Sequence, residues 1–110
     1  MSLNQRMVNA FMTRQPMGEL ATTISENGEV FENGVLIARW GSLRRGVYIR
    51  PVARTHPRYR AVISRLNAIA SYVTGGEMGI TTQGGVPAQN VGGRLYPIST
   101  EDWTRIERQQ

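Results

Sequence analysis

Only one stretch of this 110-residue sequence has the apolar periodicity of a long helix, and the rest of the fold has to pack around it. The stretch follows Pro57 and stops at Gly75-Gly76, as expected from the preference for proline at helix starts and glycine at helix ends. Thr55 is a candidate N-cap. Apolar residues recur at intervals of three and four: Tyr59, Val62, Ile63, Leu66, Ile69, Ala70 and Val73. This pattern predicts a helix whose apolar face covers a sheet.

Strand signals fill the segment before this helix. Four runs rich in β-branched and apolar residues occupy positions 21–24, 30–31, 35–40 and 47–52. Asn27-Gly28 and Asn33-Gly34 separate the first three, and Asn-Gly is a strong hairpin signal because both residues tolerate positive φ. The two pairs are too close together for both to flank long strands, so a bulge or loop at one of them is an alternative to a second turn. The longer run behind Asn33-Gly34 favours that pair as the turn. The sequence therefore predicts an α+β fold, with a small antiparallel β-meander packed on one main amphipathic helix.

A second, shorter helix is predicted at the N-terminus. Its apolar residues recur at spacings of three to five and stop before Gln15-Pro16: Leu3, Met7, Val8, Phe11 and Met12. A helix of this length is marginal alone, so it needs to pack on the domain itself or on a second subunit, which leaves a homodimer open. We therefore divide the chain into an N-terminal arm or short helix, residues 1–18, and a single α+β domain, residues 19–110.

The C-terminal third is expected to be mostly irregular. Residues 75–93 are rich in Gly, Thr, Gln and Asn and predict a long mobile loop, interrupted by a short strand at 78–82. Residues 95–98 are expected to form an edge strand, because their proline cannot donate a ladder hydrogen bond. Residues 99–102 predict the start of a short terminal helix, with Trp103 facing inward.

The composition excludes several classes of site. There is no cysteine and one histidine, His56, so disulfides, thiolate metal sites and multi-histidine metal sites are not expected. The glycine pairs match neither dinucleotide-binding nor P-loop spacing, so we interpret them as loop glycines and expect no cofactor. Residues 1–16 lack the apolar core of a secretory signal, and no stretch approaches the roughly 20 apolar residues that cross a bilayer. We therefore expect a cytoplasmic protein with no membrane or metal partner.

All thirteen basic residues are arginine, and the formal net charge is +5. Arginine binds phosphate and carboxylate bidentately and stacks on aromatic rings. Codon usage in a GC-rich genome explains the preference for arginine over lysine equally well, but it does not explain where the arginines lie. Eight of them fall between Asn33 and Gly76, in a stretch with no acidic residue and hence a charge of +8: Arg39, Arg44, Arg45, Arg50, Arg54, Arg58, Arg60 and Arg65.

Aromatic residues are interleaved with this arginine block, at Trp40, Tyr48 and Tyr59. Basic side chains neutralise phosphates and exposed aromatics stack on bases, so the mixture is typical of nucleic-acid binding. In strands, Arg39 and Arg50 would point away from the face that covers the helix. The candidate contact residues are Arg39, Arg44, Arg45, Tyr48, Arg50, Arg54, His56, Arg58, Arg60 and Arg65. A solvated basic face, with Trp40 and Tyr59 in the core, is an equally good interpretation.

Part of the chain resembles small uncharacterised phage-encoded proteins. The resemblance lies in the Gly-punctuated meander of residues 27–40, in Tyr48-Ile49 and in the helix start Thr-His-Pro-Arg-Tyr-Arg at 55–60. It covers about a third to a half of the chain, and its motifs are unspecific. It implies a viral origin, and hence a location in the host cytoplasm, but assigns no activity.

Two kinds of partner fit these features. The first is nucleic acid, DNA or RNA, bound by a non-enzymatic accessory protein whose arginines contact phosphates. The alternative is an acidic surface of a host protein, which a viral inhibitor or anti-defence factor would bind and modulate with the same arginines. Catalysis is not expected, because His56 lies between Arg54 and Arg58 with no carboxylate nearby in sequence to orient it. Phosphate contact or helix capping suits His56 better.

Overall fold

The computed structural model describes residues 1–41 and 46–107, and in those ranges it contains two helices and nine strands. In chain order the elements are α1 (Leu3–Met12), β1 (Met17–Glu19), β2 (Thr22–Ile24), β3 (Val30–Glu32), β4 (Val35–Trp40), β5 (Gly46–Ile49), α2 (Tyr59–Val73), β6 (Met78–Gln83), β7 (Val86–Val91), β8 (Arg94–Pro97) and β9 (Thr104–Glu107). The predicted α+β class is confirmed. Neither of the two described helices is long and apolar enough to cross a membrane.

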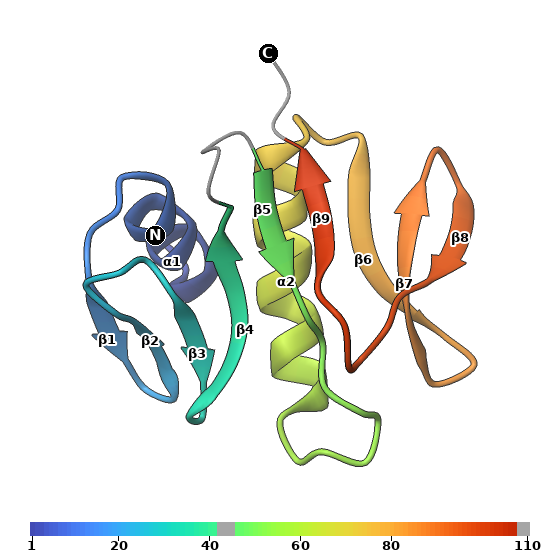
Figure 1. Cartoon of the computed structure of the whole chain (residues 1–110), viewed down its shortest axis with the longest axis horizontal. Helices are drawn as coiled ribbons and strands as arrows, with labels where there is room; N and C mark the ends of the chain where they lie inside the picture. Colours follow the sequence, from blue (N-terminus) through green and yellow to red (C-terminus); the bar gives the residue numbers. More distant parts are fainter. Residues whose placement is uncertain (42–45, 108–110) are drawn as a thin grey trace.

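The predicted meander forms one antiparallel sheet. Strands β1 to β5 follow one another across it, and β9 adds a sixth strand beside β5 (Figure 1). Both Asn-Gly pairs lie in turns between paired strands. Asn33 and Gly34 have φ of 51° and 80°, the left-handed values that a type I′ turn requires, while Gly28 has φ of 78° within the longer connection between β2 and β3. Strand β1 crosses the predicted arm boundary at residue 18.

Helix α2 has the limits that its apolar pattern predicted. Gly75 and Gly76 follow it with φ of 66° and 91°, so they end the helix as expected. The predicted cap at Thr55 is wrong, because the N-cap residue is Arg58. The backbone N–H of Arg58 donates a hydrogen bond to Nδ1 of His56 at 3.0 Å, so the imidazole holds the helix start.

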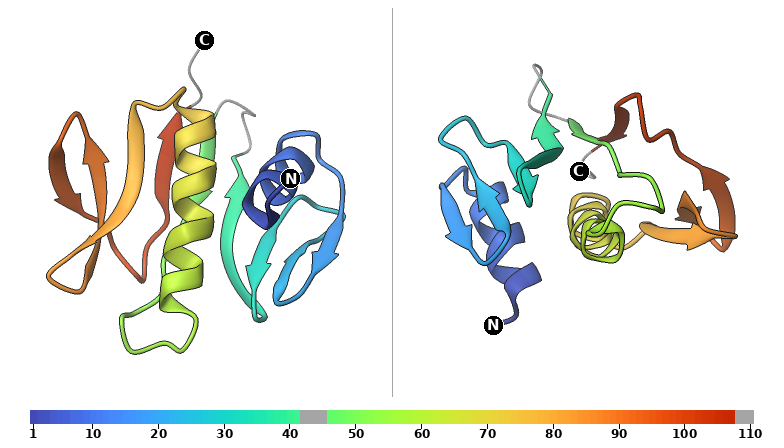
Figure 2. Two further views of the ribbon diagram at one scale, coloured as in Figure 1. Left: turned by 180° about the vertical axis from the view of Figure 1, so that it is seen from behind. Right: turned by 90° about the horizontal axis from the view of Figure 1, so that it is seen from below.

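The helices share one face of the six-stranded sheet. Helix α1 contacts β1 and β2, while α2 lies behind β5 and β9 and packs its other flank on β6 (Figures 1 and 2). The core joins both helices to the sheet, and its fully buried apolar side chains include Met7, Phe11, Val30, Ile37, Val47, Ile49, Val62 and Leu66. Because Met7 and Phe11 have no exposed surface, α1 packs on its own domain.

The predicted mobile loop at 75–93 is wrong, because these residues form most of a three-stranded antiparallel sheet, β6-β7-β8. Gly84-Gly85 and Gly92-Gly93 have φ between 58° and 85° and make its two tight hairpin turns. Burial of Ile80 and Ala88 offsets the entropic cost of ordering this polar segment. The predicted edge strand at 95–98 is confirmed by β8, which lies at the sheet edge.

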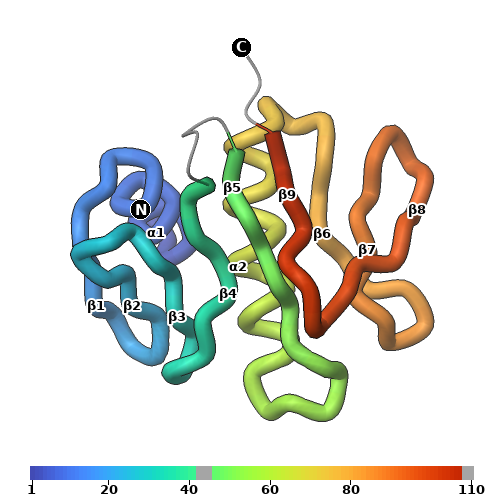
Figure 3. Tube along the Cα trace, in the orientation of Figure 1, coloured from blue at the N-terminus to red at the C-terminus, as the bar shows by residue number. Residues whose placement is uncertain are grey.

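The predicted C-terminal helix is also wrong. The Ser99 hydroxyl accepts hydrogen bonds from the backbone N–H groups of Glu101 and Asp102, which is a local turn and not a helix start. The chain then extends as β9 and pairs with β5, far from it in sequence (Figure 3). Residues 103–107 alternate between the two faces of the sheet, and this alternation buries Ile106 in the core.

Candidate nucleic-acid interface

The structure divides the ten predicted contact residues into separate groups. Arg44 and Arg45 lie outside the described residues. Three residues lie on or beside the sheet face that neither described helix covers: Arg39, Tyr48 and Arg50. Three line a pocket at the start of α2: Arg54, His56 and Arg60. The last two, Arg58 and Arg65, form ion pairs with a buried carboxylate.

Arg58 and Arg65 both pair with Glu32, which has no exposed surface. Nη2 of Arg58 donates to Oε2 of Glu32 at 2.6 Å, and Nε of Arg65 donates to Oε1 at 3.3 Å. The Thr22 hydroxyl donates to the same Oε1 at 2.5 Å. Arg58, the N-cap residue of α2, and Arg65, seven residues further on, lie on one side of the helix, as predicted, but that side meets a carboxylate from β3.

The network holds Glu32 in its charged form. Burial raises the pKa of Glu32, but the hydrogen bonds from Thr22 and Arg58 and the charges of Arg65 and Arg58 lower it more, so its pKa lies below the ordinary value. Removing either arginine would leave part of a buried charge unpaired. We therefore assign Arg58 and Arg65 to the stability of the fold and leave them out of the interface.

The open face of β4, β5 and β9 carries a group of cations and aromatic rings. Backbone register places Arg39 opposite Tyr48, and Tyr48 opposite Arg105, so the three side chains form a row across three strands. Arg50 and Trp103 lie two residues beyond Tyr48 and Arg105, on the same side of the sheet. We name Arg39, Tyr48, Arg50 and Trp103 the arginine–aromatic face.

Stacking holds this face together. The guanidinium carbons of Arg39 and Arg50 lie 4.8 and 4.4 Å from the centre of the Trp103 ring. Arg39 also lies 5.4 Å from the Tyr48 ring centre. Each such contact is worth about 0.5–1 kcal/mol at an exposed site, so the side chains are ordered but only weakly held.

Glycines make room for these side chains. A Cβ atom on Gly41 would lie 2.9 Å from the Tyr48 ring. On Gly46 it would lie 2.8 Å from Nε of Arg105, whose guanidinium forms an exposed ion pair with Glu107 at 3.4 Å. Side chains of the face can therefore lie flat over the ends of β4 and β5.

The charges of the arginine–aromatic face are uncompensated. Among the described residues, no carboxylate pairs with Arg39 or Arg50, and neither guanidinium donates a hydrogen bond. A guanidinium stacked on an aromatic ring keeps its N–H donors at its edge, where phosphate oxygens can accept them. The face can therefore offer charge, hydrogen-bond donors and π surfaces to one ligand.

Trp103 is the member of the face that the sequence prediction missed. It was expected to point inward from a helix, but in the extended chain it is half-buried on the outer side, opposite to Ile106. The signal was the period-2 alternation of residues 103–107, which is typical of a strand with one buried face.

Trp40 and Tyr59 have structural roles, as the core interpretation predicted. The Trp40 ring stacks on Phe11 with ring centres 5.0 Å apart, and its Nε1 donates to the Phe11 carbonyl at 3.1 Å. Tyr59 is buried, and its hydroxyl hydrogen-bonds the Thr82 hydroxyl at 2.9 Å. Of the three interleaved aromatics, only Tyr48 contributes to the open face.

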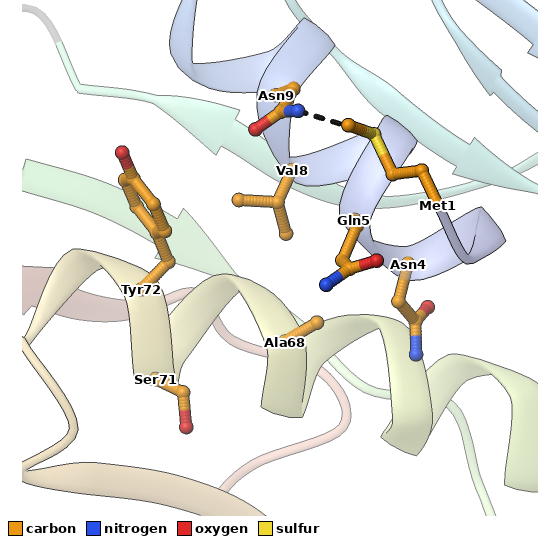
Figure 4. A pocket seen from close by; sticks show the side chains of 8 residues that line it. All are labelled: Met1, Asn4, Gln5, Val8, Asn9, Ala68, Ser71 and Tyr72. Carbon is orange, nitrogen blue, oxygen red and sulfur yellow. Dashed lines mark hydrogen bonds between the residues drawn. The ribbon is translucent and has the colours of Figure 1, made fainter.

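A separate pocket lies between the two helices (Figure 4). Amide side chains of α1, from Asn4, Gln5 and Asn9, face Ala68 and Tyr72 of α2 across it. No charged side chain lines the described part of this pocket, so it lacks the chemistry that distinguishes the arginine–aromatic face.

Comparison with known proteins finds no matching family model, no similar curated protein and no similar solved structure. The resemblance to phage-encoded proteins therefore stays a prediction.

Proposed function

We propose that this protein binds single-stranded nucleic acid through the arginine–aromatic face and catalyses no reaction. The observation that carries the proposal is the stacking of the Trp103 ring against the guanidiniums of Arg39 and Arg50, which have no ion-pair partner within residues 1–41 and 46–107. A sheet face with exposed aromatics and cations suits a single strand, because the bases can stack while the backbone runs past the charges.

The relative strengths of the contacts favour replacement of internal stacking by a base. Stacking of a base on an aromatic side chain is worth about 1–3 kcal/mol, whereas an exposed cation–π contact is worth about 0.5–1 kcal/mol. A base can therefore displace Arg39 or Arg50 from the Trp103 ring. The released guanidinium stays close enough to pair with the adjoining phosphate.

The test is a fluorescence-anisotropy titration with labelled single-stranded DNA, single-stranded RNA and duplex DNA across a salt series. We expect binding to single strands that weakens with salt. Replacing Arg50 with alanine should lower the slope of log affinity against log salt by about 0.7, the value for one phosphate contact on a single strand. Arg94→Ala is the matched control, because it removes the same charge from β8, on the other sheet.

Variants of Trp103 distinguish the contribution of stacking from that of charge in the same assay. Trp103→Ala should weaken binding roughly tenfold or more without changing the salt slope, and Trp103→Phe should retain most of the affinity. Thermal unfolding of each variant controls for loss of structure. Absence of binding to every nucleic acid at low salt would refute the proposal and direct attention to an acidic protein partner.

A further inference from the structure

An open pocket of about 740 Å³ lies between the start of α2 and the turn that joins β6 to β7. Three segments line it: the connection between β5 and α2 supplies Arg54 and His56, the first turn of α2 supplies Arg60, and the hairpin supplies Gly84 and Gly85. It brings residues about 30 positions apart in the sequence to one place.

The charge of the pocket is positive and unpaired. Arg54 and Arg60 are both exposed, and within the described ranges neither forms an ion pair or donates a side-chain hydrogen bond. No carboxylate is among the described residues that line the pocket. An anion bound in the pocket would compensate these charges and accept charge-assisted hydrogen bonds from guanidinium donors.

His56 adds a neutral donor. Its Nδ1 accepts the backbone N–H of Arg58 at 3.0 Å, so that nitrogen carries no proton. The proton of a neutral imidazole then resides on Nε2, which becomes a hydrogen-bond donor. The pocket thus combines two cationic donors with a third donor that is fixed in its tautomer by the helix start.

The walls of the pocket are held in place. A Cβ atom on Gly85 would lie 2.7 Å from Cδ of Arg54, so the hairpin turn packs directly on the Arg54 side chain. The hydrogen bond between the hydroxyls of Tyr59 and Thr82, at 2.9 Å, ties the start of α2 to β6. A site whose donors are already positioned loses less entropy on binding.

We propose that this pocket binds a phosphate group. Planar guanidiniums bind phosphate oxygens bidentately, and two of them with an imidazole N–H can satisfy several oxygens of one tetrahedral anion. The phosphate can belong to a small molecule or to the 5′ end of a nucleic-acid strand. The inference does not depend on the arginine–aromatic face, which uses other residues.

The test follows backbone amide resonances of the whole isotope-labelled chain during titration with inorganic phosphate, with sodium chloride adjusted to keep the ionic strength constant. We expect saturable shifts at Gly84 and Gly85. Arg54→Ala and Arg60→Ala should each weaken phosphate binding roughly tenfold or more, because each removes a charge-assisted hydrogen-bond donor. Arg94→Ala, with the same change in charge, should bind phosphate as the wild type does.

Arg60→Ala keeps the test decisive if loss of the packed Arg54 side chain prevents folding, because Arg60 is exposed. Linear, non-saturating shifts, or unchanged affinity in Arg60→Ala, would overturn the inference. The Arg39→Ala/Arg50→Ala double variant should bind inorganic phosphate with the affinity of the wild type. Failure of the proposed nucleic-acid function and failure of this site therefore give different results.

Two further probes identify the source of the phosphate. An oligonucleotide with a 5′-phosphate is compared with the same oligonucleotide ending in a 5′-hydroxyl, and adenosine monophosphate is titrated separately. Tighter binding of the phosphorylated strand that disappears in Arg60→Ala assigns the pocket to strand ends. Equal binding of both strands, with saturable shifts from the monophosphate, assigns it to small phosphorylated ligands.

Discussion

Glu32 shows how one residue decides which arginines are available to a partner. It ends β3 with no exposed surface and forms ion pairs with both Arg58 and Arg65, which sequence alone left unpaired. A buried carboxylate with two guanidiniums and a hydroxyl around it is tolerated because each of its oxygens accepts hydrogen bonds. The single carboxylate compensates one of the two positive charges, and the ion pairs hold both guanidiniums against the fold.

We expect Glu32→Gln to destabilise the protein by about 3 kcal/mol at neutral pH, because it leaves the partly buried Arg65 without its counter-charge. The pKa of Glu32 is lowered by folding, so its contribution is complete above the ordinary carboxyl pKa and is lost as the pH falls through the folded value. Urea unfolding across pH should therefore show the two proteins converging in acid.

The control for this variant is Glu19→Gln. Glu19 pairs with Arg6 at the surface, and that hydrogen bond lowers the pKa of Glu19. Exposed ion pairs contribute little, so its loss should cost much less than the loss of Glu32. A stability difference between wild type and Glu32→Gln that persists unchanged at low pH would contradict the assigned network.

Elements of the C-terminal third depend on turns and partner strands more than on their own propensity. The polar residues of β6, β7 and β8 give weak strand signals, but two Gly-Gly turns bring them into register. Strand β9 has the period-2 pattern of a strand, and the free edge of β5 gives it a place to pair. Together these elements supply Trp103 to one candidate site and Gly85 to the other.

We expect Gly92→Asn to retain or slightly raise stability and Gly92→Val to lower it by about 1–2 kcal/mol. Gly92 has φ of 59° and open space around its Cβ position, so the backbone conformation alone distinguishes the two replacements. Asparagine tolerates that conformation and valine does not. Chemical denaturation measures the difference, and equal stability of the two variants would argue against the hairpin turn.

The whole molecule is organised around α2, which packs on both sheets. The Asn67 side chain of α2 accepts a hydrogen bond from the backbone N–H of Ile80 at 2.9 Å, so the helix also provides a partner for a backbone donor at the edge of β6. Because the three-stranded sheet buries few apolar side chains of its own, we infer that it folds only together with the helix. The two candidate sites then depend on the same cooperative unit.

Leu66→Ala tests this cooperativity. Leu66 has no exposed surface, and its truncation should cost about 3 kcal/mol through lost burial and the cavity left behind. Native-state hydrogen exchange should show the most protected amides of both sheets losing protection by the same free energy. Unchanged protection in β6, β7 and β8 would show that the three-stranded sheet is an independent unit.

Local sequence was sufficient wherever neighbouring residues alone set the structure. The apolar stripe of α2, its glycine stop and the Asn-Gly turns follow from periodicity and backbone preference, so these elements could be predicted. Local alternation also predicted that Arg39, next to buried Ala38, and Arg50, next to buried Ile49, point away from the helix. Charge counting likewise identified the arginine block.

Long-range contacts determined the rest. Pairing of Arg58 and Arg65 with Glu32 joins residues 26 and 33 positions apart, and the stacking of Arg39 and Arg50 on Trp103 joins β4 and the end of β5 to the start of β9. No local propensity encodes such contacts, because their free energy exists only after distant strands have paired. The tertiary structure therefore distributed the described arginines of this block among an ion-pair network around Glu32, an open stacking face and an open pocket at the start of α2.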